Sequence, residues 1–392
     1  MAAKPWRPAL WARYKALVPV CVLTAAALCG CATRSATGGA SSGNTGRALT
    51  LGMVTDAGLG SPAFGRSARH GLMWAQTRLG AKITIVRSHS ASEYQPNLTA
   101  LVNRGERMIF AVGYLMRGDL AAVARRFPGQ RFAIVDGVVN EPNVVSVTFK
   151  EQDGAFMVGA LAGLATKTNS VAFLGGMDLP SIQMLEAGFS AGVCQTNPNA
   201  RVFVEYAGSF DDAATGKQLA GTLYARGADI IFAAAGKTAR GAIDEVKRRP
   251  AGDYVIGVDS DQDALAPGRV LTSLVKHVDV AILDIAKQVE DGGDPSGHVV
   301  LGLADDGVGM TGMKYTAGIL TPRDREELAA IRGAVVAGKI VPPSTREQLR
   351  SFTPLPLGRR PVRSDARLCN GAPAPIPIAG GVATKGPSPS LR

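Results

Sequence analysis

The stretch Tyr254-Val-Ile-Gly-Val-Asp-Ser-Asp-Gln262 joins an apolar run, typical of a buried strand, to the acidic residues Asp259 and Asp261. In open α/β sheets, ligands bind just beyond the carboxyl ends of the strands. A second apolar run, Val270-Leu-Thr-Ser-Leu-Val-Lys276, ends in a lysine. A carboxylate accepts hydrogen bonds from hydroxyl groups, and an ammonium group donates to them. Asp259 and Lys276 at neighbouring strand ends therefore favour a ligand rich in hydroxyl groups, with Asp259 as the counter-charge of Lys276.

Apolar runs of this kind alternate with helical patterns along the body of the chain. A first series of strands is expected at residues 50–54, 82–86, 108–112 and 131–135. A long helix over 153–166 separates it from a second series, expected at residues 170–174, 201–206, 229–233 and 254–258. The other helices are expected at about 66–79, 93–104, 118–126, 182–195, 212–226 and 238–248. Parallel strands separated by helices predict an α/β fold with two parallel-sheet lobes.

The first 30 residues have the organisation of an export signal. Four basic residues and no acidic residue precede an apolar run of 13 residues, Ala16 to Leu28, which is too short to span a bilayer. The following Leu28-Cys29-Gly30-Cys31 resembles the lipobox of bacterial lipoproteins, although Cys29 stands where a small residue is usual. That resemblance implies cleavage before Cys31 and acylation of its sulfur. The alternative is an ordinary signal peptide with an incidental cysteine.

Composition excludes several classes of protein. The chain is 46% hydrophobic and 19% charged, as is typical of a globular protein. Its formal net charge of +11 is concentrated in residues 1–30 and 354–392, so no basic face predicts a nucleic-acid partner. The eight prolines of residues 354–392 predict a disordered tail. Cys194 and Cys369 give no metal pattern and no disulfide framework, and Cys194 is interpreted as a buried thiol.

Three enzyme-like patterns occur in the wrong context. Gly188-Phe-Ser-Ala-Gly192 matches the nucleophile elbow of hydrolases, but it lies inside a helical pattern instead of at a strand-to-helix turn. Gly236-Lys-Thr238 lacks the first glycine of a P-loop, and Gly58-Leu-Gly60 lacks a third glycine at the spacing of a dinucleotide-binding loop. The four histidines are scattered. We therefore expect no enzymatic activity, no cofactor and no metal site.

The body also resembles a known family, through stretches that follow one another in order. These are Gly52–Asp56, Phe132–Asp136, Asn143–Gly154, Gly175–Pro180, Glu186–Gly192, Tyr206–Asp212, Gly227–Phe232, Ala234–Gly236, Ile256–Gln262 and Leu271–Lys276. On these residues the chain is similar to the basic membrane lipoproteins (BMP), a group of ABC-transporter substrate-binding proteins, over roughly residues 50–350. The resemblance implies a type I periplasmic-binding-protein fold, with two α/β lobes, a three-segment hinge and a ligand held between the lobes. Characterised members of the family bind purine nucleosides.

The same resemblance implies a ligand site, carried over position by position: Asp56, Phe64, Asp136, Phe210, Gly236, Asp259 and Lys276. The two phenylalanines would sandwich the base, and the first two aspartates would accept hydrogen bonds from its N–H groups. Asp259 and Lys276 would hold the ribose hydroxyls, and Gly236 would allow close approach of the backbone. The alternative for each aspartate is a helix cap, and for each phenylalanine a place in the core.

The chain departs from the family pattern at two places in this site. Ala63 and Gly65 flank Phe64 where the family has Ser and Asn. Lys237-Thr-Ala-Arg240 replaces a glycine-rich stretch after Gly236 and adds bulk and charge. These departures predict altered recognition of the base, so the ligand is not necessarily a standard purine nucleoside.

The expected organisation has six parts. They are a signal peptide (1–30), a flexible tether from Cys31 (31–48), an N-terminal lobe (49–150), a C-terminal lobe (151–275), hinge-crossing segments that complete both lobes (276–353) and the tail (354–392). The expected function is capture of a nucleoside outside the cytoplasm, at a membrane to which a lipid anchors the protein, and its delivery to an ABC permease. The alternative is a ligand-sensing or regulatory lipoprotein of the same fold that binds a different small molecule.

The lipobox interpretation predicts the effect of removing the thiol that would be acylated. Cys31→Ala should move the protein from the membrane fraction to the soluble fraction, because two acyl chains give stable anchoring and the unmodified chain has none. Fractionation followed by mass spectrometry of the mature N-terminus tests this. A variant that stays in the membrane, together with a wild type that carries no lipid, would show that the interpretation is wrong.

Overall fold

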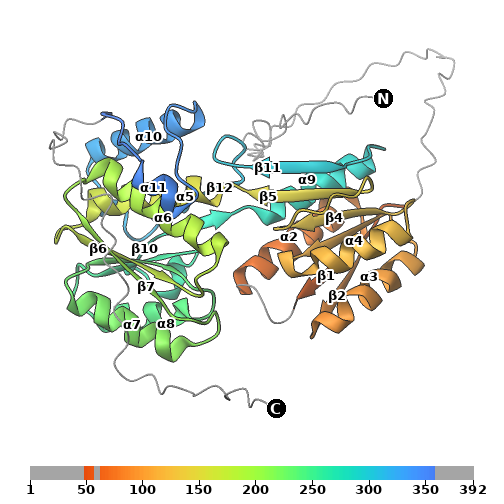
Figure 1. Ribbon diagram of the computed structural model, residues 1–392, viewed down its shortest axis with the longest axis horizontal. Helices are drawn as coiled ribbons and strands as arrows, with labels where there is room; N and C mark the ends of the chain where they lie inside the picture. Colours follow the sequence, from red (N-terminus) through yellow and green to blue (C-terminus); the bar gives the residue numbers. More distant parts are fainter. Residues whose placement is uncertain (1–47, 57–61, 358–392) are drawn as a thin grey trace, which may run out of the picture. The chain divides into compact units, whose positions relative to one another are not determined.

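The computed structural model describes residues 48–56 and 62–357, without the side chains of Asp56, Pro62 and Ala63 (Figure 1). The predicted signal peptide, Cys31, nearly all of the tether and residues 358–392 of the predicted tail lie outside this described part. Among the described residues, no helix is both long enough and apolar enough to cross a membrane.

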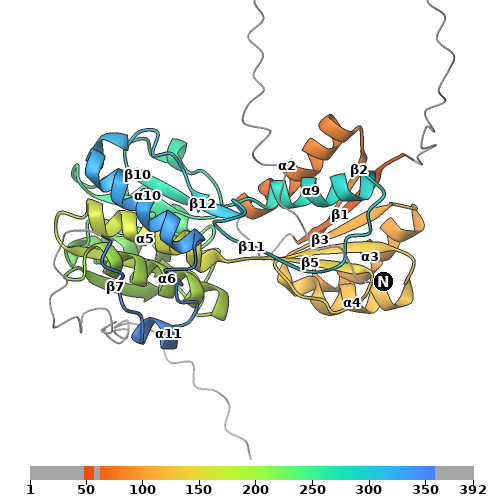
Figure 2. The same cartoon turned by 90° about the horizontal axis from the view of Figure 1, so that it is seen from above.

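The first sheet contains six parallel strands in the order β11-β5-β4-β3-β1-β2. Their bounds are β1 (Thr50–Asp56), β2 (Lys82–Ser88), β3 (Met108–Val112), β4 (Arg131–Val135), β5 (Val144–Phe149) and β11 (Gly297–Leu301). All five residues of β3 are buried, because a parallel sheet covered by helices on both faces has no solvent-exposed side. The covering helices are α2 (Pro62–Leu79), α3 (Tyr94–Asn103), α4 (Arg117–Arg126) and α9 (Val278–Glu290). Helix α2 packs against α9 on one face, and α3 packs against α4 on the other (Figure 2).

The second sheet also has six strands, in the order β12-β10-β9-β8-β6-β7. The strands are β6 (Ser170–Gly175), β7 (Arg201–Tyr206), β8 (Ile230–Ala234), β9 (Tyr254–Gly257), β10 (Val270–Lys276) and β12 (Val308–Met310). All neighbouring pairs are parallel except β10 and β12, which are antiparallel. The helices are α5 (Glu151–Ala165), α6 (Pro180–Thr196), α7 (Ala213–Ala225), α8 (Ala239–Val246), α10 (Pro322–Val336) and α11 (Arg346–Arg350). Short 3₁₀ turns occur at Ala91–Glu93, Tyr114–Met116, Asp263–Leu265 and Ala317–Ile319.

The chain passes from one sheet to the other at three places. It leaves the first sheet between β5 and α5, returns between β10 and α9, and leaves again between β11 and β12. Two α/β sheets of parallel strands joined by three segments are the type I periplasmic-binding-protein fold, so the predicted fold class is confirmed.

The observed elements agree with the apolar patterns where strands and helices alternate. Strands β3, β4, β7 and β10 have the predicted bounds, and the other predicted strands shift by one or two residues. Strand β5 was not expected. Parallel neighbours are usually joined by a crossover helix, but only the loop 136–143 separates β4 from β5. The sequence patterns also do not predict β11, β12, α9, α10 or α11.

Glycines let α5 and α6 pack with their backbones in contact. A Cβ at Gly188 would lie 2.5 Å from the carbonyl oxygen of Gln152, and one at Gly192 would overlap the carbonyl oxygen of Phe156. Both glycines lie inside α6, so the elbow-like motif is helical and serves packing, as the sequence indicated.

Two interpretations of the sequence need correction, one about Cys194 and one about the tail. Cys194 is buried at 4% exposure, as expected, but it is disulfide-bonded and not a free thiol. The segment after residue 353 begins as part of the body, because the backbone of Leu355 forms two hydrogen bonds with the side chain of Gln195, at 2.6 and 2.9 Å. Phe352 also packs edge-on against Phe156 of α5.

The packing of α5 on α6 predicts opposite effects for two glycine substitutions. Gly192→Ala should lower the free energy of unfolding by about 1–3 kcal/mol, because the new methyl group overlaps the backbone of α5 and neither helix can move cheaply. Gly333→Ala is the control: it lies within α10 with nothing within 4 Å of its Cβ position, so it should stabilise by about 0.5–1 kcal/mol. Urea unfolding measures both values, and equal effects would contradict the packing argument.

Candidate functional site

Backbone turns in the left-handed region follow the carboxyl ends of the central strands in both sheets. In the first sheet, Gly113 follows β3 with a φ of 120°, and Asp136 follows β4 with a φ of 63°. In the second sheet, Gly236 follows β8 with a φ of 59°, and Asp259 comes close after β9 with a φ of 69°. Asp136 and Asp259 hold equivalent places, because β4 and β9 are each third from the edge of their sheet. Left-handed aspartates at such strand ends carry strain of the kind that clusters at functional sites.

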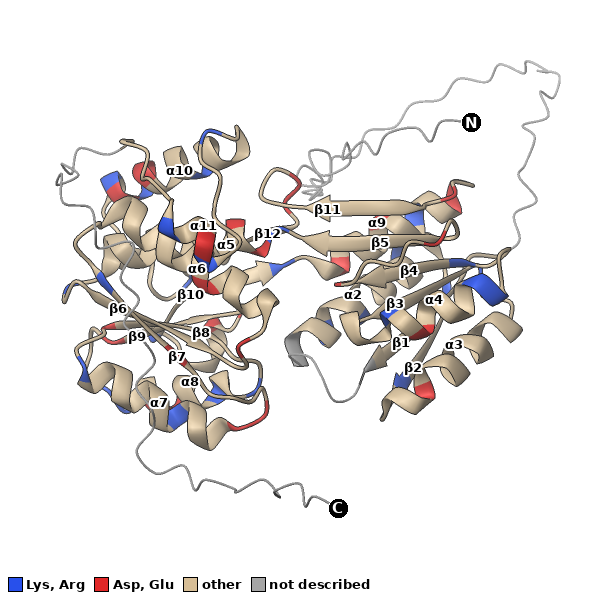
Figure 3. Cartoon of the chain, in the orientation of Figure 1, with Lys and Arg blue, Asp and Glu red and all other residues tan. Residues whose placement is uncertain are grey.

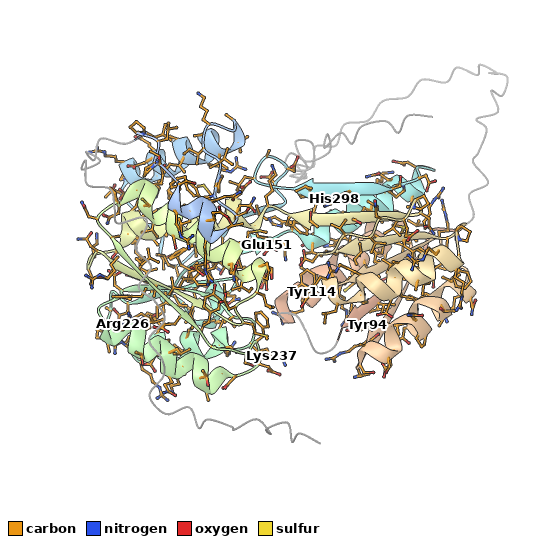
Figure 4. All side chains as sticks on the ribbon, viewed as in Figure 1. Tyr94, Tyr114, Glu151, Arg226, Lys237 and His298 are labelled. Carbon is orange, nitrogen blue, oxygen red and sulfur yellow. The ribbon has the colours of Figure 1, made fainter. Side chains whose placement is uncertain are left out.

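One buried lysine joins residues of the two sheets. Lys276 ends β10 at 6% exposure, and its Nζ lies 2.7 Å from Oδ2 of Asp136 and 3.0 Å from Oε1 of Glu151. Asp136 follows β4 in the first sheet. Glu151 opens α5 and is labelled in Figure 4. The ammonium thus donates one hydrogen bond to each of these two carboxylates.

The electrostatics of this cluster are dominated by burial and by carboxylates. Burial disfavours the Lys276 ammonium, but the charges of Asp136, Glu151 and Asp259 outweigh burial and hold the lysine pKa well above its usual value. Burial also raises the pKa of Glu151 to about 7, with Lys276 opposing the rise and the two aspartates adding to it. Three carboxyl groups therefore surround one ammonium group. Such a cluster suits a ligand that carries no negative charge and brings several hydrogen-bond donors.

The arrangement corrects one expectation about Asp259. The predicted neighbourhood is present, since the Lys276 backbone N–H donates to the Asp259 carbonyl oxygen at 3.3 Å and the two side-chain charges interact. The expectation that Asp259 alone balances Lys276 is wrong, because Asp136 and Glu151 both lie within hydrogen-bond distance of the ammonium. The apolar run that ends in Lys276 carries no signal of these partners from other segments.

Two aromatic rings flank the same ammonium group. The Lys276 Nζ lies 4.8 Å from the ring centroid of Phe64, in the first turn of α2, and 5.5 Å from that of Phe149, at the end of β5. Cations at these distances are attracted by the ring faces. The structure thus brings Phe64 together with Asp136 and Lys276, and it adds Phe149 and Glu151, which sequence reasoning missed although both lie in the family-matching stretch 143–154.

Phe210 lies against the strand ends of the second sheet. A Cβ at Gly176 would overlap the Phe210 ring, and one at Gly236 would lie 3.1 Å from the Phe210 carbonyl oxygen, so both positions require glycine. That carbonyl oxygen accepts the backbone N–H groups of Lys237 at 2.8 Å and Thr238 at 3.2 Å. Phe210 and Gly236 are therefore in direct contact at the carboxyl ends of β6 and β8.

Lys237 and Thr238, which depart from the family pattern, form polar contacts with the loop that carries Phe210. The exposed Lys237 lies 2.9 Å from Oδ2 of Asp211 (Figure 4). The buried Thr238 hydroxyl donates to the Ser209 carbonyl oxygen and accepts from the Asp212 N–H, each at 2.9 Å. Both substitutions thus hold the loop that carries Phe210. Asp56 ends β1, and its side chain is not among those described.

Comparison with known proteins shows the family to which the chain belongs. Residues 48–337 match the family model described as "ABC transporter substrate-binding protein PnrA-like". Since the match covers well over half of the chain, the chain belongs to this family. It is a substrate-binding protein of the ABC-transporter class and not an enzyme.

Individual relatives are similar over most of their length. The chain is 38% identical to the "CD4+ T-cell-stimulating antigen" of Listeria monocytogenes over 285 residues, which cover 67% of this chain and 80% of that protein. It is 32% identical to the "ABC transporter nucleoside-binding protein BmpA" of Lactococcus lactis over 354 residues, 85% of this chain and 99% of that one. Among solved structures, an ABC transporter solute-binding protein of Aeropyrum pernix matches with a TM-score of 0.67 at 24% identity, covering 75% of this chain and 94% of that chain. That structural likeness supports the fold alone.

The cluster predicts a stability change that depends on pH. Lys276→Met leaves three partly buried carboxyl groups without their cation, so the variant should lose about 3–5 kcal/mol of unfolding free energy at neutral pH. The loss should shrink as pH falls towards 5, because Glu151, whose pKa burial raises to about 7, then binds a proton in the folded state.

Lys287→Met is the matched control, because Lys287 also contacts two carboxylates, Glu290 and Asp291, but at the surface. It should lose no more than about 1 kcal/mol. Chemical denaturation at several pH values measures both variants, and equal losses would contradict the buried cluster.

Proposed function

We propose that the protein is a lipid-anchored binding protein that captures a purine nucleoside outside the cytoplasm and delivers it to an ABC permease. Ribose hydroxyls bind Asp259 and Lys276, and the base lies between Phe64 and Phe210 with its N–H groups directed to Asp136 and Asp56. The observation that carries the proposal is the cluster of three carboxyl groups around one buried ammonium. A nucleoside is uncharged and supplies donors to the carboxylates and acceptors to the lysine.

The carboxyl groups and the lysine of the site should favour nucleosides over nucleotides and free bases. A nucleotide would bring its phosphate towards Asp136, Glu151 and Asp259, and like charges in a partly buried site repel. A free base lacks the ribose and would leave Asp259 and Lys276 without ligand partners, which lowers affinity. Outside this site, acidic and basic residues are interspersed along the described helices and strands (Figure 3).

The relatives support the remaining parts of the proposal. One relative is named a nucleoside-binding protein of an ABC transporter, and others are named basic membrane proteins, as in Borreliella afzelii. Together with the lipobox-like Leu28–Cys31, these names favour an anchor at Cys31 and a permease as partner. The three segments between the sheets then act as the hinge about which the lobes close on the ligand.

Calorimetry tests the ligand class directly. Adenosine, guanosine or inosine should bind the wild type more tightly than free bases, sugars or nucleoside monophosphates. Asp259→Ala should weaken the preferred nucleoside at least about tenfold, because one charged hydrogen bond contributes about 1.5–3 kcal/mol.

Asp261→Asn is the matched control, since Asp261 is exposed and its side chain accepts the Asp263 N–H, which an amide oxygen can still do. It should bind like the wild type. A protein that binds a sugar or an amino acid, and none of the three nucleosides, would refute the proposed ligand.

A further inference from the structure

Glu151 contacts the lysine of the site but has no role in the ligand contacts proposed above. It is the first residue of α5, directly after the chain leaves β5, and its side chain is 16% exposed. Its Oε1 accepts a hydrogen bond from the Lys276 Nζ at 3.0 Å. The charged groups that act on it come from three elements: Lys276 from β10, Asp136 after β4 and Asp259 after β9.

Two carboxylates compete for the same ammonium group. Asp136 lies 2.7 Å from the Lys276 Nζ and Glu151 lies 3.0 Å from it. In the proposed function, Asp136 directs its carboxylate to the base, which weakens its bond to the lysine. Lys276 is nearly fully buried, so it needs another anion at hydrogen-bond distance when this happens. Glu151 is the carboxylate that already occupies that place.

We propose that Glu151 is a positioning residue of the ligand site, whose ionised carboxylate holds the Lys276 ammonium while Asp136 turns to the ligand. The inference rests on the proposed function and adds a property to it. When Glu151 binds a proton it loses its charge, and Lys276 is drawn to Asp136, which is then less able to receive the base. Protonation of Glu151 therefore weakens nucleoside binding.

The direction of the pH dependence follows from the burial of Glu151. Burial raises the pKa of this carboxyl group from 4.5 to about 7, against the opposing charge of Lys276. The position of Glu151 in the first turn of α5 favours its ionised form, because the helix dipole is positive there. The carboxyl group consequently changes charge close to neutral pH. Affinity rises as pH increases through this range and levels off above it.

Titration of the full chain with adenosine and guanosine between about pH 5.5 and about pH 8.5 tests the inference. The wild type should bind about tenfold more tightly at the upper end, the effect of one charged hydrogen bond. At every pH, the Glu151→Gln variant should have the affinity that the wild type has at the lowest pH. The variant should weaken free bases as well as nucleosides, because Asp136 is the residue that receives the base.

Asp284→Asn is the matched control for this titration. Asp284 lies in α9, and burial alone raises its pKa to about 6, with no charged group of the cluster acting on it. Its substitution should leave the pH dependence of affinity unchanged. A wild-type affinity that does not change with pH, or a Glu151→Gln variant that retains the wild-type profile, would overturn the inference.

A measurement without ligand separates this inference from the proposed function. A double-mutant cycle of Glu151→Gln and Lys276→Met, followed by unfolding at about pH 8, should be strongly non-additive, because each residue is the other's buried partner. Additive effects would overturn the inference. If the wild type binds no nucleoside, the proposed function fails, and the cycle still decides whether Glu151 holds Lys276.

Discussion

A single ammonium group buried at the end of β10 constrains the arrangement of the site. A lysine removed from water must find anions nearby, and Lys276 finds one after a strand of the other sheet and one at the start of α5. Lys276, Asp136 and Glu151 belong to parts of the chain that are connected by the segments crossing between the two sheets. The ion cluster therefore ties the strand ends of both sheets to the helix that follows the first crossing, and Phe64 and Phe149 complete its surroundings.

The rest of the fold places this cluster through close backbone packing. Helices α5 and α6 approach each other through glycines, which fixes the first turn of α5 and with it Glu151. In the second sheet, Gly176 and Gly236 let the Phe210 ring lie on the strand ends, and Thr238 fastens the loop that carries Phe210. The charged cluster and the loop that carries Phe210 are thus supported by different contacts, so substitutions in one are expected to leave the geometry of the other intact.

Much of the architecture was predictable because alternating apolar strands and helices encode a parallel α/β fold locally. The strands β3, β4, β7 and β10 follow directly from their apolar runs, and Asp136, Asp259 and Lys276 lie at strand ends as expected. Strand β5 and the elements after residue 276 were missed, because no helix separates β4 from β5 and the later segments alternate between the two sheets. The partners of Lys276 were also missed, since Asp136 is 140 residues and Glu151 125 residues away in sequence. Local patterns carry no information about such pairs.

The central claim is that this cluster of three carboxyl groups and one ammonium binds an uncharged, hydroxyl-bearing ligand, a purine nucleoside. Mass spectrometry of the small molecules released by denaturing the purified protein tests it most directly, because a ligand held by several charged hydrogen bonds can survive purification. The account predicts release of a purine nucleoside from the wild type and much less of it from Lys276→Met. Release of a nucleotide, a sugar or an amino acid in its place, in an amount comparable with the protein, would contradict the account.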